Sequence, residues 1–131
     1  MFSTRGRYAL RVMIDLAQHQ EEEYVPMKDV AARQGISLKY LEQILPPLKK
    51  ADMIVGMQGK GGGYRLTKKP EEYLIGDILR LTEKAIAPVA CLERDAKECE
   101  RKGECKTIAF WSGLNDAINN YIDGVTLADF I

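Results

Sequence analysis

The feature that most constrains this chain is a helix-forming segment followed by a short glycine-rich hairpin, within residues 37–64. Ser37 is a good N-cap, because its hydroxyl can accept a hydrogen bond from the free amides of a first helical turn. The leucines behind it recur at helical spacing and predict one inward apolar face: Leu38, Leu41, Leu45 and Leu48. The opposite face carries side chains long enough to reach base edges or phosphates: Lys39, Tyr40, Glu42 and Gln43.

Two strand-like runs, residues 53–57 and 64–67, lie on either side of residues 59–63, which are all glycine except Lys60. Such glycines are typical of a hairpin turn that needs positive φ angles. A phosphate-binding loop is absent, and a dinucleotide fingerprint beginning at Gly59 would require glycine where Tyr64 stands. The run therefore predicts a winged helix, with Gln58 and Lys60 near the tip of a wing that follows the minor groove or the DNA backbone.

Two helices are expected before this segment. The first runs from a cap at Ser3 to about Gln20 and is apolar on two faces, which predicts burial on two sides, in part between subunits. A shorter helix begins at Pro26 and ends at Gly35. With the helix that follows Ser37 it forms a helix-turn-helix, whose second helix enters the major groove.

Pro46 and Pro47 fall inside that second helix. Each proline lacks an amide donor, and its ring crowds the carbonyl group four residues back. The recognition helix is therefore expected to bend or stop near Leu45, with residues 48–51 forming a separate turn.

The charge of the chain is divided between its halves. Residues 1–70 carry 12 Lys/Arg against 7 Asp/Glu, and residues 71–131 carry 7 against 12, so the halves are +5 and −5. A basic half suits a polyanion such as double-stranded DNA. No apolar run approaches the ~20 residues that span a bilayer, and the first residues lack a signal-peptide core, which predicts a cytoplasmic protein with no membrane partner.

Residues 106–123 predict a long helix near the end of the chain. Its apolar residues alternate in steps of three and four: Ile108, Trp111, Leu114, Ile118, Tyr121 or Ile122, and then Val125. This stripe favours a dimerisation helix, although it would also suit packing on the chain's own core. We expect a mostly α fold with a small β-hairpin wing (α+β): a winged helix-turn-helix domain (residues 1–84), a cysteine loop (residues 85–105), and a dimerisation helix with a C-terminal turn (residues 106–131).

Three cysteines, Cys91, Cys99 and Cys105, lie in this polar loop, which has few apolar anchors. An odd count in a reducing compartment indicates ligands or reactive thiols rather than a disulfide framework. A bound ligand can order such a loop. Three thiolates suit an iron–sulfur cluster, or zinc with a fourth ligand, and the lysines and arginine nearby would instead suit a redox-active thiol.

Several segments of the chain resemble the Rrf2 family of bacterial winged-helix regulators, in its IscR-like branch, which is related to CymR and NsrR. They are STRGRYALRVMIDLA, SLKYLEQIL, GKGGGYRL, IGDILRLTE and the terminal TLADF. The resemblance implies a homodimer on a palindromic operator. It also implies an iron–sulfur cluster held by the three cysteines that modulates DNA binding. We expect a two-iron cluster ahead of a four-iron one, and expect it to be absent from protein prepared in air.

The chain departs from the IscR-like pattern at the fourth cluster ligand. The histidine expected three residues after the last cysteine is Ile108, and the matching positions of the first helix are Arg7 and Arg11, which are poor ligands. His19 carries no motif and is expected at the surface. The open candidates are a residue of the other subunit, a small exogenous molecule, or a loop carboxylate: Glu93, Asp95, Glu98, Glu100 or Glu104.

These patterns together predict a DNA-binding transcriptional regulator, expected to be a repressor, that senses iron–sulfur or redox status. The residues expected to contact DNA are Ser37, Lys39, Tyr40, Glu42, Gln43, Gln58 and Lys60. Two alternatives are a thiol-based redox or cysteine-metabolism regulator of CymR type without a cluster, and a winged-helix module that binds proteins. An enzyme is disfavoured, since no Ser-His-Asp set, Cys-His pair or metal-binding helix motif is present.

Overall fold

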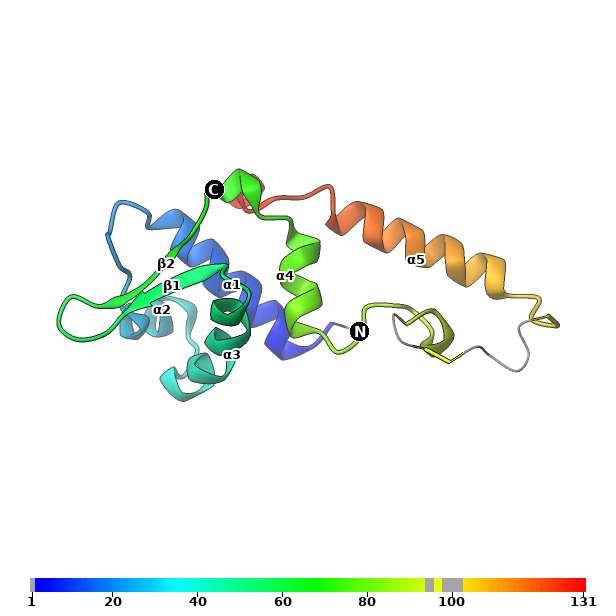
Figure 1. Cartoon of the computed structure of the whole chain (residues 1–131), viewed down its shortest axis with the longest axis horizontal. Coiled ribbons are helices and arrows are strands. Elements are labelled where there is room, and N and C mark those ends of the chain that lie inside the picture. Colours follow the sequence, from blue (N-terminus) through cyan, green and yellow to red (C-terminus); the bar gives the residue numbers. More distant parts are fainter. Residues whose placement is uncertain (1, 94–95, 98–102) are drawn as a thin grey trace.

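The computed structural model describes residues 2–93, 96–97 and 103–131, arranged as Figure 1 shows. The described part contains a two-stranded antiparallel sheet, five α-helices and three short 3-10 helices. In chain order they are α1 (Thr4–Gln18), α2 (Met27–Gln34), α3 (Leu38–Lys50), β1 (Ile54–Met57), β2 (Gly63–Leu66), η1 (Pro70–Glu72), α4 (Ile75–Thr82), η2 (Ala90–Leu92), α5 (Ile108–Ile122) and η3 (Leu127–Phe130). The mostly α fold with a small hairpin is confirmed. No helix in this described part is long and apolar enough to cross a membrane.

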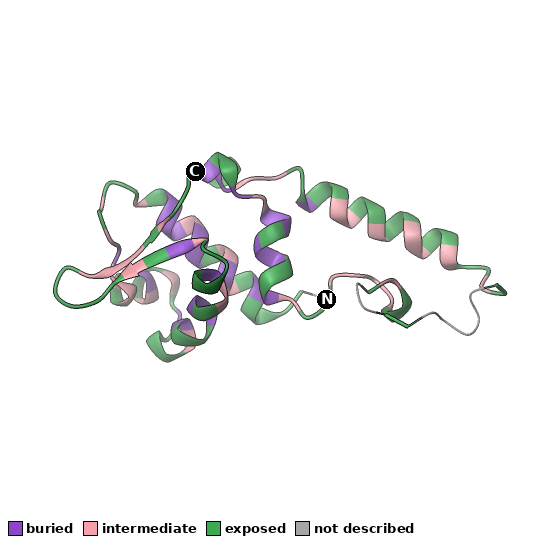
Figure 2. Cartoon of the chain, viewed as in Figure 1, coloured by how far each residue is buried: buried purple, intermediate pink, exposed green. Residues whose placement is uncertain are grey.

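Helix α1 is the central element of the body, because it packs against α2, α3, α4 and strand β2. Figure 2 shows buried residues gathered along α1, α3 and α4. The side chains that meet there are almost completely buried: Ala9, Val12, Met13, Leu16, Leu41, Ile44, Leu48 and Ile78. Of the two apolar faces of this helix, the one formed by Ala9, Val12 and Leu16 lies in the core, whereas Leu10 and Ile14 on the other are only half-buried.

Helix α3 continues through its two prolines to Lys50, so the prediction that it bends or stops near Leu45 is wrong about the stop. The prolines cost two hydrogen bonds to the carbonyl groups of Glu42 and Gln43, but both of these residues are exposed and water can satisfy them. On the opposite face Leu45 is 5% exposed and its buried neighbours hold the helix against the core. Tertiary burial outweighs the local penalty here.

Leu38 was expected on the inward face of this helix, and the structure contradicts that, because Leu38 is 46% exposed. The residue is the first of α3, where the helix has not yet reached the core. Ile44 takes the fourth inward position instead, with no exposed surface.

Helix α5 projects from the body as an arm (Figure 1). Ile122, its last residue, is the one buried residue of this helix. The chain then returns to the body through backbone hydrogen bonds, from the Ile75 amide to the Val125 carbonyl (2.9 Å) and from the Leu127 amide to the Tyr73 carbonyl (3.1 Å). The arm is therefore anchored at its C-terminal end.

Candidate nucleic-acid interface and cysteine loop

The turn between α2 and α3 is fixed by a helix cap at each side. Gly35 closes α2 in the left-handed conformation, with φ 64°. The Ser37 hydroxyl then accepts a hydrogen bond from the Tyr40 amide at 3.1 Å, as the sequence predicts. This cap starts α3 with Lys39, Glu42 and Gln43 exposed on the side away from the core.

Tyr40 is placed by contacts with α1. Its ring meets the edge of Tyr8 with centroids 5.6 Å apart and planes at 80°. Arg11 lies over the Tyr8 ring, 5.2 Å from its centroid, and donates to the side-chain oxygen of Gln34 at 3.1 Å and to its carbonyl. Arg11 therefore joins α1 to the end of α2, which gives it a structural task that sequence reasoning missed.

The hairpin pairs Ile54 with Leu66 and Met57 with Gly63. Gly59 and Gly61 in its turn have φ angles of 92° and 78°, a region that residues with a Cβ avoid. The tip residues Gln58 and Lys60 are exposed, which is the placement that the sequence predicts for a wing.

The base of the hairpin is tied to the body at two places. Val25 and Tyr64 exchange backbone hydrogen bonds of 2.8 and 3.0 Å. The buried Tyr73 hydroxyl donates to the Met53 carbonyl (2.6 Å) and accepts from the amides of Thr67 (2.9 Å) and Lys68 (3.1 Å). Tyr73 lies between η1 and α4, and no local sequence pattern signals this role.

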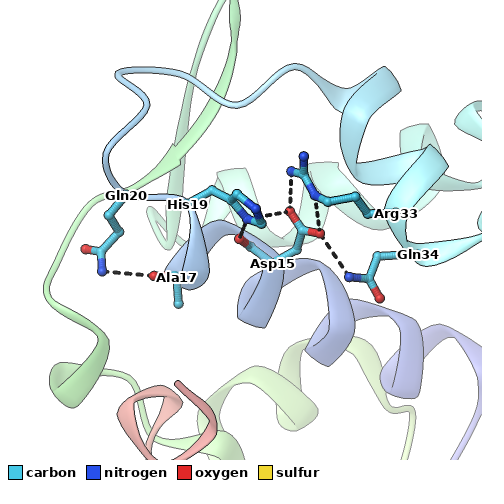
Figure 3. Close-up of polar contacts among 6 residues, drawn as sticks. All are labelled: Asp15, Ala17, His19, Gln20, Arg33 and Gln34. Atoms are coloured by element: carbon cyan, nitrogen blue, oxygen red, sulfur yellow. Dashed lines mark hydrogen bonds and ion pairs between the residues drawn. The ribbon is translucent and has the colours of Figure 1, made fainter.

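A buried ion pair joins α1 to the helix-turn-helix (Figure 3). The Asp15 carboxylate, 1% exposed, accepts from Arg33 at 2.7 and 3.0 Å and from the Gln34 amide group at 2.9 Å. Burial raises the pKa of Asp15, but these hydrogen bonds outweigh burial and hold it below its usual value. The signal in the sequence was an acid within the apolar run of the first helix.

His19 takes part in the same cluster. Its Nδ1 lies 2.7 Å from the Asp15 carbonyl oxygen and 3.4 Å from the Asp15 carboxylate (Figure 3). The ring is half-buried rather than at the open surface. Its ring contacts lie within α1, with Asp15.

The structure describes two of the three predicted cysteine ligands. Cys91 is exposed within η2, and Cys105 is half-buried, with its sulfur 3.5 Å from the Thr107 hydroxyl, shortly before α5 begins. Cys99 lies outside the described residues. Within the described ranges no three Cys, His, Asp or Glu side chains gather as a metal site, so the fit to a cluster rests on thiol chemistry alone.

Cys91 opens onto a hollow of about 900 Å³ between the loop, α4 and α5. Glu93 lines the same hollow, together with Arg80 and two asparagines of α5. Of the other carboxylates proposed as fourth ligand, Glu104 is exposed, and Asp95, Glu98 and Glu100 lie outside the described residues. Ile108 is the first residue of α5 and brings no donor atom.

The outer face of α5 leaves large apolar side chains uncovered. Phe110 is 64% exposed, Leu114 39% and Tyr121 72%. Trp111 and Ile118 of the predicted stripe are half-buried instead. The exposed face is thus turned slightly from that stripe and includes Phe110, which the spacing of three and four did not select.

The chain is similar to known proteins over nearly its full length. A model of the Rrf2 family, described as an iron-dependent transcriptional regulator, matches residues 2–131. IscR of Aliivibrio salmonicida (strain LFI1238), an HTH-type transcriptional regulator, is 36% identical over 129 residues that cover 98% of this chain and 76% of that protein.

Solved structures agree with this result. T. potens IscR is 36% identical with a TM-score of 0.77, over 98% of this chain and 84% of that one. CymR, the global cysteine regulator of B. subtilis, is 35% identical with a TM-score of 0.78, over 98% and 94%. The names of these relatives are those of regulators, in agreement with the prediction that the chain is not an enzyme. The chain belongs to the Rrf2 family of transcriptional regulators.

Proposed function

We propose that this regulator binds a palindromic DNA operator as a homodimer and acts as a repressor whose affinity follows the state of its cysteine loop. In this assignment residues 1–84 bind DNA, residues 85–105 sense iron–sulfur or redox status, and residues 106–131 join the subunits. The observation that carries the DNA-binding part is α3, which buries one face in the core and presents a polar face beside a glycine-turn hairpin. A DNA-binding role also supports a cytoplasmic location.

The proposed contacts fall into two kinds. Phosphate contacts come from Lys39 at the start of α3 and from Lys60 at the wing tip, both exposed. Base contacts come from side chains on the polar face of α3, of which Gln43 has the amide that pairs with an adenine edge. The residues assigned to the interface are Ser37, Lys39, Tyr40, Glu42, Gln43, Gln58 and Lys60.

Salt and substitution test this interface together. Binding to a selected duplex should weaken steeply as salt rises, because lysine and arginine contacts release condensed counterions. Lys60→Ala should weaken all duplexes about equally. Gln43→Ala should cost ~1–3 kcal/mol at one base position and little at the others. Equal losses on every sequence for Gln43→Ala would remove its assigned role.

The homodimer is supported by α5. A projecting helix that exposes Phe110, Leu114 and Tyr121 has an apolar face that the described residues of its own chain leave uncovered. A second copy packed on this face would bury it and place two recognition helices on one duplex, as a palindrome requires.

The sensing part is supported by the chemistry of the loop. Cys91, Cys99 and Cys105 would hold an iron–sulfur cluster, of the two-iron type first, because thiolates are the ligands that such clusters favour. When bound, the cluster supplies a centre sensitive to oxygen and redox state. Cys105 lies three residues before α5, so a change in the loop reaches the start of the arm directly.

Purification without oxygen decides this part. Iron and acid-labile sulfide analysis, visible absorbance and Mössbauer spectra should show a cluster. Protein that contains zinc or no metal, and stays colourless after reconstitution with iron and sulfide, would contradict it. A thiol-based regulator would then be the better assignment, and the similarity to CymR supports that alternative.

A further inference from the structure

Arg80 on α4 holds the end of α5 through a forked contact. Its Nη1 and Nη2 donate to the two carboxylate oxygens of Asp123, both at 2.8 Å. Nη2 also donates to the side-chain oxygen of Asn119 at 2.8 Å, one turn earlier on α5. Asp77 adds a weaker ion pair at 3.6 Å. The hydrogen bond with Arg80 keeps the pKa of Asp123 below its usual value, and raises that of Arg80.

Helix α4 makes room for this contact. A Cβ on Gly76, one turn before Arg80, would lie 2.0 Å from the Asp123 carboxylate. Gly76 is the second residue of α4 and is buried. Gly76, Arg80 and Asp123 therefore act as one unit, which we call the α4–α5 clamp.

The clamp fixes the direction of α5, whose C-terminal end is already held by backbone hydrogen bonds. The backbone bond between Ile75 and Val125 fixes the point where the arm leaves the body. The fork at Arg80 lies more than a turn further along α4 and fixes a second point, so that the axis of α5 is defined. A helix of 15 residues is about 22 Å long, so a tilt of about 10° at the clamp moves the far end by about 4 Å.

Helix α4 also connects α5 to the proposed recognition helix, α3. It packs against α3 and α1, and its Ile78 is fully buried in the core that these helices share. The angle between the arm and α3 therefore passes through α4 and its clamp. In a dimer joined through α5, that angle sets how far apart the two copies of α3 lie.

We infer that Arg80 is a positioning residue that fixes the half-site spacing of the operator, by holding α5 at one angle to the recognition helix. The inference rests on the proposed DNA-binding homodimer. It assigns Arg80 no contact with DNA and no part in holding a cluster.

Selection from a pool of random duplexes tests this inference with the full chain. The wild-type protein should enrich inverted repeats of one spacing, because a rigid dimer accepts half-sites in one geometry. Arg80→Ala should enrich the same half-site sequence at several spacings. Its affinity for the duplex selected by wild type should fall by about 5- to 150-fold, with binding to a single half-site unchanged.

Three further clamp variants and one control outside the clamp separate a loss of positioning from general damage to the fold. Asp123→Asn keeps the shape and loses the charge, and Gly76→Ala displaces Asp123 from the α4 side, so both should relax the spacing as Arg80→Ala does. Arg80→Lys keeps the charge but not the fork, and should give an intermediate result. Asp116→Ala removes an exposed charge from α5 and should keep the wild-type spacing.

The outcomes are distinct. If wild type selects one spacing and all clamp variants select the same one, the inference fails while the proposed function stands. If a folded clamp variant becomes monomeric, the inference also fails, because the clamp then joins subunits rather than orienting them. If wild type enriches no duplex, the proposed function and the inference fail together.

Discussion

Replacing Asp15 with asparagine should destabilise the protein by about 3 kcal/mol. The carboxylate accepts three hydrogen bonds from Arg33 and Gln34, and asparagine keeps only one of its two acceptor oxygens. Two of these bonds go to Oδ2, so an asparagine whose amide nitrogen takes that position loses both, at about 1.5–3 kcal/mol each for a charged partner. The lower figure applies, because the Arg33 side chain is 34% exposed and water can solvate it again.

Thermal unfolding followed by circular dichroism measures this loss. At about 2.1 cal/mol/K per residue, 131 residues give an unfolding entropy of about 0.28 kcal/mol/K, so Tm should fall by about 11 °C. Asp116→Asn, an exposed acid on α5, is the matched control and should change stability by less than about 0.5 kcal/mol. Combining Asp15→Asn with Arg33→Gln should cost less than the two single losses added, because both remove the same pair.

The direction of the Asp15 pKa shift predicts how the stability of the protein depends on pH. The folded pKa of Asp15 is depressed, so the carboxylate stabilises the fold above its unfolded pKa of about 4 and loses this contribution as pH falls through the folded value. The Tm values of wild type and Asp15→Asn should therefore begin to converge as pH falls below about 4, and should meet once pH is below the folded pKa of Asp15. A loss smaller than about 1 kcal/mol near neutral pH, or one that persists unchanged in acid, would refute the reasoning.

Three other predictions concern separate parts of the chain. Tyr73→Phe should cost about 1–3 kcal/mol in urea unfolding, because three backbone groups at the base of the wing lose their hydroxyl partner. Phe110→Asp or Tyr121→Asp should give a monomer in sedimentation velocity with its helical circular dichroism intact, since both side chains are mostly exposed. Cys105→Ala should abolish the visible absorbance of protein reconstituted with iron and sulfide, and alter affinity for the selected duplex.

Each of these predictions has a result that contradicts it. A Tyr73→Phe protein as stable as wild type would show that water replaces the hydroxyl. Aspartate variants of α5 that remain dimeric would move the subunit interface to another surface. A coloured Cys105→Ala protein would remove that thiol from the ligand set.

The order and type of the elements followed from local signals, because caps and glycines act on their own neighbours. The Ser37 cap and the glycines after Gln58 sufficed to place α3 and the hairpin. Local rules failed at Pro46 and Pro47. The low helix propensity of proline predicts that α3 ends there, but packing against the core keeps it helical. Leu38 was misplaced because periodicity gives the angle of a side chain around the helix but not how far along the helix the core extends.

The contacts that organise the candidate site were beyond sequence reasoning for another reason. Asp15 and Arg33 are 18 positions apart, and Arg80 and Asp123 are 43 apart. Which acid meets which arginine depends on how the helices pack, and many pairings have the same local pattern. The DNA-contacting residues and the cysteine ligands remain predictions, and experiments on binding and metal content decide them.

The attachment of the hairpin has a consequence for how DNA is discriminated. A Cβ on Gly63 would lie 2.1 Å from the Val25 carbonyl oxygen, so this close seam beside α2 depends on glycine. In the proposed complex with DNA, a hairpin held there moves together with the helices and does not open or close to follow grooves of different width. The duplex must then adjust its own shape. Stiff and flexible base steps differ in the energy of that adjustment, so the protein can distinguish sequences that it never touches.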